Sequence, residues 1–284
     1  MNNYVQRFLL EDLDIRGAIV HVDSVWQQML QDRDYPVPVL KILGEMCATT
    51  LLLSYNLKQL GRLTVQLKGN GPVSMLVIDC NESLHLRGMA KYSHSITPQP
   101  VPDLLGHGQL VLTLDRQSMQ ETYQSIVPLD GDSIAEIFQH YFRQSEQLPS
   151  RLFLTTSAEA IFGILLQKLP TMVQRDPDDW TRIEAISATV LDQTMVGLPA
   201  EAILRRLFVE ETIRIFEPQV VSYGCHKDTA KVLDMLQSLG RAEVNAILKE
   251  FGEVIVHDDI CNHEYRFDAL AIEAIFGEAG PMVH

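Results

Sequence analysis

Two cysteines, Cys225 and Cys261, constrain how the C-terminal quarter of this chain can fold. Residues 225–284 contain only short predicted elements, and a module of about sixty residues lies near the size at which a metal or a crosslink is needed for stability. A structural zinc site usually takes four ligands from two closely spaced pairs. One cysteine at each end of the segment supplies half of such a site.

The composition is that of an ordinary globular protein. The chain has 284 residues, of which 46% are hydrophobic and 21% charged, enough for one large domain or two smaller ones. Its formal net charge is −14, and an acidic surface argues against nucleic acid or an anionic membrane as the main partner. We therefore expect recognition that is not mainly electrostatic.

The N-terminus and the cysteine content predict a cytoplasmic protein. Residues 1–7 contain no basic stretch followed by an apolar core, and we expect no apolar run of the ~18 residues that span a membrane. The four cysteines, Cys47, Cys80, Cys225 and Cys261, occur without a secretory signal. In a reducing compartment, clustered cysteines more often serve metal or redox chemistry than static disulfides.

The first region, residues 1–172, is predicted to contain both helices and strands. Apolar residues at helical spacing predict two helices within residues 26–60, separated at residues 35–38, with Met46 and Cys47 as packing residues. A further helix is predicted to open near Asp132. Strands are predicted at residues 63–67, 73–78, 84–90, 109–114, 123–127 and 151–155. This pattern indicates an α+β core.

The second region, residues 173–224, reads as a helical linker. It opens with a polar run at residues 175–179, and apolar residues then follow at helical spacing from Trp180 to Gly197. Pro199 marks the start of a second helix. The apolar faces of these helices either pack on the first region or detach and expose a binding surface, and the sequence leaves both readings open.

The third region, residues 225–284, predicts a small ααββα module. Asp228 can cap a first helix that Gly240 closes, and a second helix ends at Gly252. A hairpin is predicted around Cys261, followed by a final helix at residues 269–276.

Several motifs spread over nearly the whole chain are specific when taken together. They are Asp34-Tyr35-Pro36, the run from Thr64 to Pro72 (TVQLKGNGP), the run from Val127 to Asp132 (VPLDGD), the run from Ser145 to Arg151 (SEQLPSR), and Tyr265-Arg266-Phe267. In these residues the chain resembles the 33 kDa chaperonins, redox-regulated heat-shock holdases of the bacterial cytoplasm.

The resemblance implies an N-terminal α/β core, a metastable helical linker and a C-terminal zinc module with a Cys-x-Cys and a Cys-x-x-Cys pair. In that family, oxidation expels zinc, forms two disulfides and unfolds the module and linker, which turns on ATP-independent binding of unfolding clients. We therefore expect a holdase chaperone, not an enzyme, whose partners are unfolded proteins, with homodimer formation on activation left open. The sequence does not identify the client-contact residues.

The chain departs from the family pattern at the cysteines. Lys227 occupies the second position of the Cys-x-Cys pair, and Asp258 the first position of the Cys-x-x-Cys pair. One reading is a weakened mixed metal site of Cys225, Cys261 and Asp258. Its fourth ligand would be one of three nearby histidines, His226, His257 or His263. The other reading is that zinc binding is lost, with Cys225 and Cys261 left as redox-sensitive thiols or joined in one disulfide.

Two other functional classes stay open. Cys225 lies next to His226, which suggests a thiol-dependent enzyme. Adjacent residues, however, rarely orient as nucleophile and base. No phosphate-binding GxxxxGK[ST] motif occurs, so we expect no nucleotide cofactor. An inactive structural paralogue of the chaperone is the remaining alternative.

Overall fold

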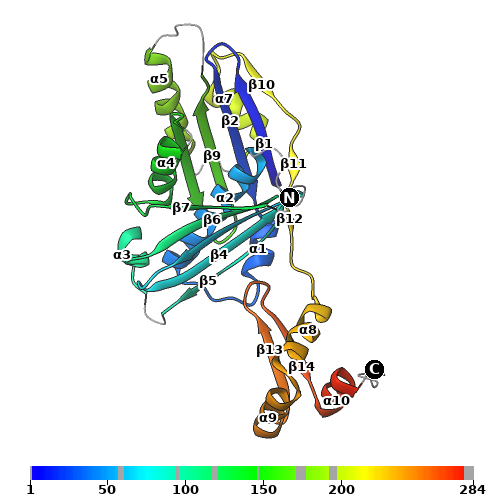
Figure 1. Cartoon of the computed structure of the whole chain (residues 1–284). Coiled ribbons are helices and arrows are strands. Elements are labelled where there is room, and N and C mark those ends of the chain that lie inside the picture. The colour runs from blue at the N-terminus through cyan, green and yellow to red at the C-terminus, as the bar shows by residue number, and fades with distance from the viewer. Residues whose placement is uncertain are drawn as a thin grey trace. The chain divides into compact units, whose positions relative to one another are not determined.

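The structure is a computed structural model that describes residues 2–56, 61–93, 96–116, 121–145, 147–170, 177–191 and 197–277. It divides into two compact units, Met1–Gly224 and Cys225–His284 (Figure 1). Each unit has a hydrophobic core of its own.

Two β-sheets form the framework of the first unit. The first sheet runs in the order β10 (Ile213–Ile215), β1 (Asn3–Leu10), β2 (Ile15–Val22), β9 (Ile161–Lys168) and β8 (Ser150–Thr156), all antiparallel, and β11 (Gln219–Val220) also pairs with β1. The second sheet runs in the order β12 (Ser222–Tyr223), β5 (His85–Tyr92), β4 (Val73–Asn81), β3 (Arg62–Lys68), β6 (Gln109–Arg116) and β7 (Glu121–Val127). Only β12 joins it in parallel.

A long apolar helix packs between these sheets. Helix α2 (Val37–Asn56) contacts β9, β8 and β2 of the first sheet and β4, β5 and β3 of the second. Its buried side chains share one large core with the inner faces of both sheets. By length and composition the segment Val37–Tyr55 could cross a membrane, contrary to our expectation that the chain has no such run, but 78% of its apolar window is buried inside the protein. The apolar character of α2 is therefore that of a core helix.

The other helices of the first unit are shorter. They are α1 (Ser24–Leu30), α3 (Val101–Leu105), α4 (Ile134–Ser145), α5 (Pro177–Ala188), the 3-10 turn η1 (Thr189–Leu191) and α7 (Ala200–Leu207). Asp23 caps α1 by accepting a hydrogen bond from the Ser24 N–H. Helix α4 packs mainly on β8, through a buried apolar face that includes Phe138 and Phe142.

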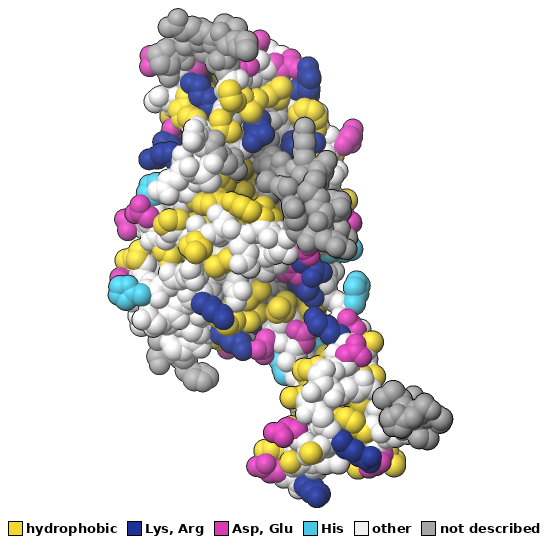
Figure 2. All heavy atoms as spheres, viewed as in Figure 1, with side chains coloured by type: hydrophobic (Ala, Val, Ile, Leu, Met, Phe, Trp, Pro, Cys, Tyr) yellow, Lys and Arg dark blue, Asp and Glu magenta, His cyan; other side chains and the backbone are white. Residues whose placement is uncertain are grey.

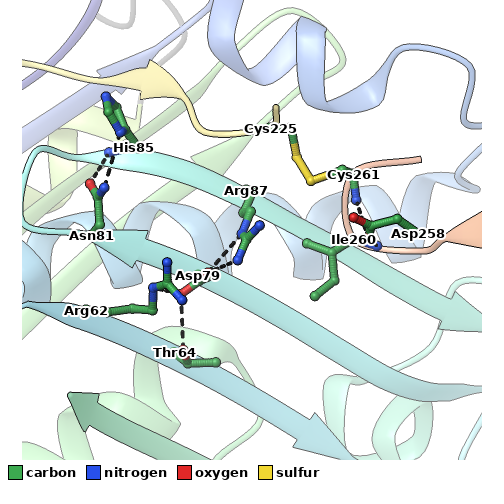
Figure 3. A network of polar contacts seen from close by, with 10 residues as sticks. All are labelled: Arg62, Thr64, Asp79, Asn81, His85, Arg87, Cys225, Asp258, Ile260 and Cys261. Carbon is green, nitrogen blue, oxygen red and sulfur yellow. Dashed lines mark hydrogen bonds and ion pairs between the residues drawn. A yellow bond between two sulfur atoms is a disulfide. The ribbon is translucent and has the colours of Figure 1, made fainter. Parts of the chain in front are cut away.

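A buried carboxylate on the second sheet is fully engaged. Asp79 of β4 accepts hydrogen bonds from Arg87 Nε at 2.9 Å and from Thr64 Oγ1 at 3.1 Å, and it forms an ion pair with Arg62 (Figure 3). Thr64 and Arg87 stand beside Asp79 on the neighbouring strands. This cluster is a cross-strand structural network in which two guanidinium groups offset the charge of the buried carboxylate.

The second unit is a small module built as the sequence predicted. Its elements are α8 (Thr229–Leu239), α9 (Arg241–Phe251), β13 (Val254–Asp258), β14 (His263–Phe267) and α10 (Ala269–Gly277). Asp228 caps α8 by accepting from the Lys231 N–H at 3.0 Å, and its own N–H donates to the Tyr265 hydroxyl at 2.9 Å. Gly240 and Gly252 close the two helices with φ of 89° and 80°, which favours glycine.

The α+β fold class predicted from sequence is confirmed, as are the predicted helices and strands of the N-terminal region. Three long strands, β1, β2 and β9, were missed. In β2 and β9 nearly every residue is buried, so the alternation of apolar and polar residues that reveals a half-buried strand is absent. The expected end of the second helix, residues 57–60, lies outside the described residues, as does the first part of the polar run at residues 175–179.

Glu45 gives a test of this core. Its side chain is buried on α2 and lies 3.9 Å from the Lys41 ammonium, and burial raises the pKa of its carboxyl to about 7. The folded protein therefore holds this proton at pH values where the unfolded chain has lost it. Stability should fall as the pH rises from about 4.5 to about 7.

We expect Glu45→Gln to increase the free energy of unfolding by roughly 2–3 kcal/mol at pH 8 and by less than about 1 kcal/mol at pH 5. Urea unfolding of both proteins at the two pH values measures this, with the exposed Glu82→Gln as the control. Equal effects of Glu45→Gln at both pH values would contradict the assignment.

Candidate redox site and linker interface

Cys225 and Cys261 are joined by a disulfide in the second unit. Their Cα atoms are 5.4 Å apart, and the bond closes a loop with a sequence separation of 36 (Figure 3). It ties Cys225, three residues before the α8 cap Asp228, to the turn between β13 and β14. The core of this unit has few fully buried side chains, so the constraint matters: Leu236, Val244, Val254, Tyr265, Phe267 and Ile272 form its buried part. A loop of this length restricts the unfolded chain by about 4 kcal/mol in the chain-entropy model.

Asp258, the residue in the position of a family cysteine, organises the hairpin turn. Its Oδ1 accepts from the backbone N–H groups of Ile260 at 3.0 Å and Cys261 at 3.2 Å (Figure 3). Asn262 completes the turn with φ of 55°, in the left-handed region that asparagine tolerates. The carboxylate therefore presents Cys261 to Cys225 through backbone hydrogen bonds.

The three candidate histidines differ in their surroundings. His226 is exposed, and His257 lies with its Nδ1 3.3 Å from Asp259. His263 packs edge-on against the ring of Tyr265, with 6.4 Å between centroids. Within the described residues, no three histidine, cysteine or acidic side chains gather closely enough to hold a metal ion.

The arrangement described does not fit a zinc ion. Both thiols are used in the disulfide, and an oxygen of Asp258 is already occupied by two backbone donors. Zinc needs deprotonated thiolates and three or four converging donors. The mixed site of Cys225, Cys261, Asp258 and one histidine would require the reduced protein, and it stays a prediction.

The other two cysteines are core residues. Cys47 and Cys80 are buried, and burial raises the pKa of both thiols, that of Cys80 to about 12. They are therefore protonated and unreactive at neutral pH. The prediction that Met46 and Cys47 serve packing is confirmed, since both side chains are fully buried.

The linker covers the second face of the first sheet. One face of this sheet packs on α2, and the opposite face forms a separate core with the linker helices. The sheet contributes Phe8, Leu10, Ile15, Ile19, Phe162, Ile164 and Leu166, and the linker contributes Ile183, Val190, Ala200, Ile203, Leu204, Leu207 and Phe208. In this state the apolar faces of the linker pack on the first region, the first of the two readings left open by the sequence.

An aromatic contact anchors the end of α7. The ring of Phe8 lies directly over Gly17, where a Cβ atom would come within 2.1 Å of it. Phe208 of the linker packs on Phe8 with 5.8 Å between ring centroids. Gly17 therefore lets the sheet accept an aromatic pair at the position where the linker leaves it.

The chain after α7 is held by strands that the sequence did not reveal. β10 and β11 extend the edge of β1, and the Phe216 N–H between them donates to the Arg7 carbonyl at 3.0 Å. The guanidinium of Arg7 lies between the rings of Tyr55 and Phe216, at 4.8 and 5.5 Å. β10 has only three residues and β11 only two, too short for a signal in the sequence.

Polar atoms are trapped in the interface between the linker and the sheet. His21 and Tyr4 face the linker from neighbouring strands, and Ser187 lies one turn beyond Ile183 on the buried face of α5. The Tyr4 hydroxyl, His21 Nδ1 and Ser187 Oγ are all buried without a hydrogen-bond partner among the described residues. Such atoms weaken an otherwise apolar interface.

Comparison with known proteins gives the family. A family model described as "Hsp33 protein" matches residues 3–268. The chain belongs to the Hsp33 family. A protein named "33 kDa chaperonin" from Methylobacillus flagellatus is 38% identical over 278 residues, covering 97% of this chain and 95% of the relative. Another of that name, from Chromobacterium violaceum, is 40% identical over 272 residues, covering 94% and 92%.

A solved structure shows the same fold. The crystal structure of the 33 kDa chaperonin from Thermotoga maritima matches with a TM-score of 0.82 and covers 98% of both chains at 21% identity. The resemblance read from the sequence motifs is thus confirmed. Membership of Hsp33 supports a chaperone role, and in this member Cys225 and Cys261 are joined by one disulfide.

Loss of this bond should loosen the second unit of this Hsp33 chain. We expect Cys225→Ser combined with Cys261→Ser to lower its free energy of unfolding by about 3–4 kcal/mol, because the unfolded chain regains loop entropy. Hydrogen exchange in α8 and α9 measures the effect, and β3 of the first unit is the internal reference. Dithiothreitol should produce the same change in the parent chain and none in the variant. Unchanged exchange in the reduced parent would refute the structural role of the bond.

Docking of the linker should depend on Leu204, which is fully buried on α7. Leu204→Ala should weaken docking by about 2–5 kcal/mol through lost packing and the cavity left behind. Amide exchange in α7 should accelerate while exchange in β3 stays unchanged. Arg206→Ala, at an exposed position of the same helix, is the matched control. Equal acceleration in α7 and β3 would mean that linker and core open together.

Proposed function

We propose that this protein is an ATP-independent holdase that binds unfolding proteins and prevents their aggregation. The observation that carries the proposal is the second apolar face of the first sheet, which is covered by the linker and by no other described element. The linker helices α5 and α7 belong to the C-terminal part of the first unit and would act there as a detachable cover. Their release would present a continuous apolar surface from the sheet and from the linker itself.

The chemistry of this surface suits unfolded chains. Aliphatic and phenylalanine side chains bind exposed apolar segments of a client without a defined sequence, because the hydrophobic effect is not directional. Exposed large apolar side chains are already present on the second unit, among them Met235, Leu239, Phe251 and Leu270. Hydrophobic side chains are visible on the surface of the molecule in Figure 2. The net charge of −14 keeps such a protein soluble and disfavours nucleic acid and anionic membranes as partners.

Regulation in this member would run through one bond. Peroxide takes two electrons and two protons from the Cys225 and Cys261 thiols, forming one disulfide and two waters. That bond lies within the second unit and stabilises it, so oxidation would tighten this unit. Activation would therefore depend more on heat or unfolding of the second unit than on peroxide alone. The placement of this activity in the cytoplasm and the formation of a homodimer on activation are parts of the same proposal.

An enzyme using Cys225 is the alternative from another class. In the disulfide, Cys225 is not a free nucleophile, and His226 beside it is exposed. A thiol nucleophile needs a base within hydrogen-bond reach and a group that orients the base. The client-aggregation assay described below distinguishes an inactive paralogue from a holdase.

We expect the protein to suppress aggregation of a heat-unfolded client without ATP. Light scattering of the client should fall after mild heating of the chaperone, whereas peroxide at low temperature should add little. Cys225→Ser with Cys261→Ser should keep activity and reach it at a lower temperature, because its second unit is less stable.

Two results would count against the proposal. Unchanged client aggregation under reducing, oxidising and heated conditions would identify an inactive paralogue. Loss of a peroxide response in the double variant, where the parent responds strongly, would show that the two cysteines suffice as an oxidative switch.

A further inference from the structure

A histidine lies under the linker. His21 belongs to the set of β2 residues, with Ile15 and Ile19, whose side chains face the linker helices, whereas Ala18 and Val20 face α2. Its strand neighbours are Tyr4 and Phe162, whose rings lie 6.1 and 6.2 Å from its own. The side chain is only 4% exposed.

The surroundings of His21 hold a neutral ring better than a charged one. Phe162 and Tyr4 present ring atoms, and the Tyr4 hydroxyl faces the backbone of Ala200. Asp23 at the end of β2 favours a charge on His21, while the amino terminus of the chain opposes it. On the linker helices, three acidic groups are already engaged in ion pairs: Glu201 with Arg205, Glu184 with Arg151 and Asp179 with Arg182.

Protons can reach the edge of this interface. A groove of about 570 Å³ lies between β1, the start of α7 and the segment from β10 to β11, and it is lined by Tyr4, Ala200 and Glu201 among others. Tyr4 therefore separates His21 from an open groove. A small opening movement of α7 would expose the ring to water.

We propose that His21 makes the docking of the linker sensitive to acid, so that protonation of its ring releases α5 and α7 from the first sheet as the pH falls below neutral. The functional consequence, acid as a trigger of client binding, rests on the proposed holdase function. The conformational change itself does not.

The direction of the pH effect on linker docking follows from the linkage between proton binding and docking. Burial lowers the pKa of His21 in the docked state, whereas the His21 ring exposed by undocking of the linker has an ordinary pKa near 6.5. The undocked state therefore binds the proton more tightly. Docking is unaffected above about pH 6.5 and weakens progressively below it, until the docked ring also becomes protonated.

The core responds in the opposite direction. Glu45 in α2 has a pKa raised to about 7 by burial, so the folded core gains stability as the pH falls from 7. Between pH 7.5 and 5.5, acid should therefore open the linker while the core beneath it stays closed. This separates release of the linker from general acid unfolding.

The test is hydrogen exchange of the full chain at pH 7.5 and 5.5, corrected for the pH dependence of intrinsic exchange. Protection of α7 should fall by up to about tenfold in the parent, since one proton is taken up with a free pKa near 6.5. Protection of β3 should stay the same or rise. His21→Gln, which cannot titrate, should abolish the fall, whereas the exposed His107→Gln should behave as the parent does.

Three outcomes would overturn the proposal: no fall in the parent, an equal fall in His21→Gln, or an equal fall in β3. If His21→Gln does not fold, nuclear magnetic resonance titration of the His21 ring in the parent decides, and a value at or above 6.5 would refute it. The aggregation assay distinguishes the two proposals. If acid releases α7 but the protein protects no client under any condition, the holdase proposal is wrong and the acid-sensitive docking of the linker is still supported.

Discussion

The packing of the first sheet on both of its faces is the constraint on which the rest of the first unit depends. One face is buried by α2, which also buries the second sheet, and the other face is buried by the linker. A sheet that is apolar on both sides cannot leave one side in water without a large hydrophobic cost. Linker and core are thus coupled, although the linker helices α5 and α7 can leave the sheet without breaking the pairing of its strands.

This interface is strong at some points and weak at others. Phe208 on Phe8 and the aliphatic face of α7 supply well-packed contacts. Tyr4, His21 and Ser187 place polar atoms among them without partners in the described part of the chain. A cover of this kind opens at a lower cost than a fully apolar one, which is consistent with the holdase mechanism proposed above.

The second unit has a small hydrophobic core and depends on a crosslink for part of its stability. Where the family pattern has four cysteines, this member has two, and the structure uses them as one crosslink, with Asp258 shaping the turn that presents Cys261. The crosslink acts within the unit. Its formation therefore favours the folded form, which is opposite to the effect that the family pattern implies for oxidation.

The sequence by itself determined the family, the α+β class and the local elements whose signals are short-range. Asp228 and Gly240 mark the ends of α8, and the spacing from Ile134 to Phe142 marks α4. It also showed that four thiolate ligands are impossible. The strands β1, β2 and β9 and the face carrying His21 were decided only by tertiary structure. Nearly all residues of β2 and β9 are buried, so no alternation of apolar and polar residues reveals these two strands. Which face of the sheet meets the linker depends on pairing between segments far apart in the chain. The sequence left the joining of Cys225 to Cys261 as one of several readings, because the pairing depends on how the segment before α8 packs against the hairpin.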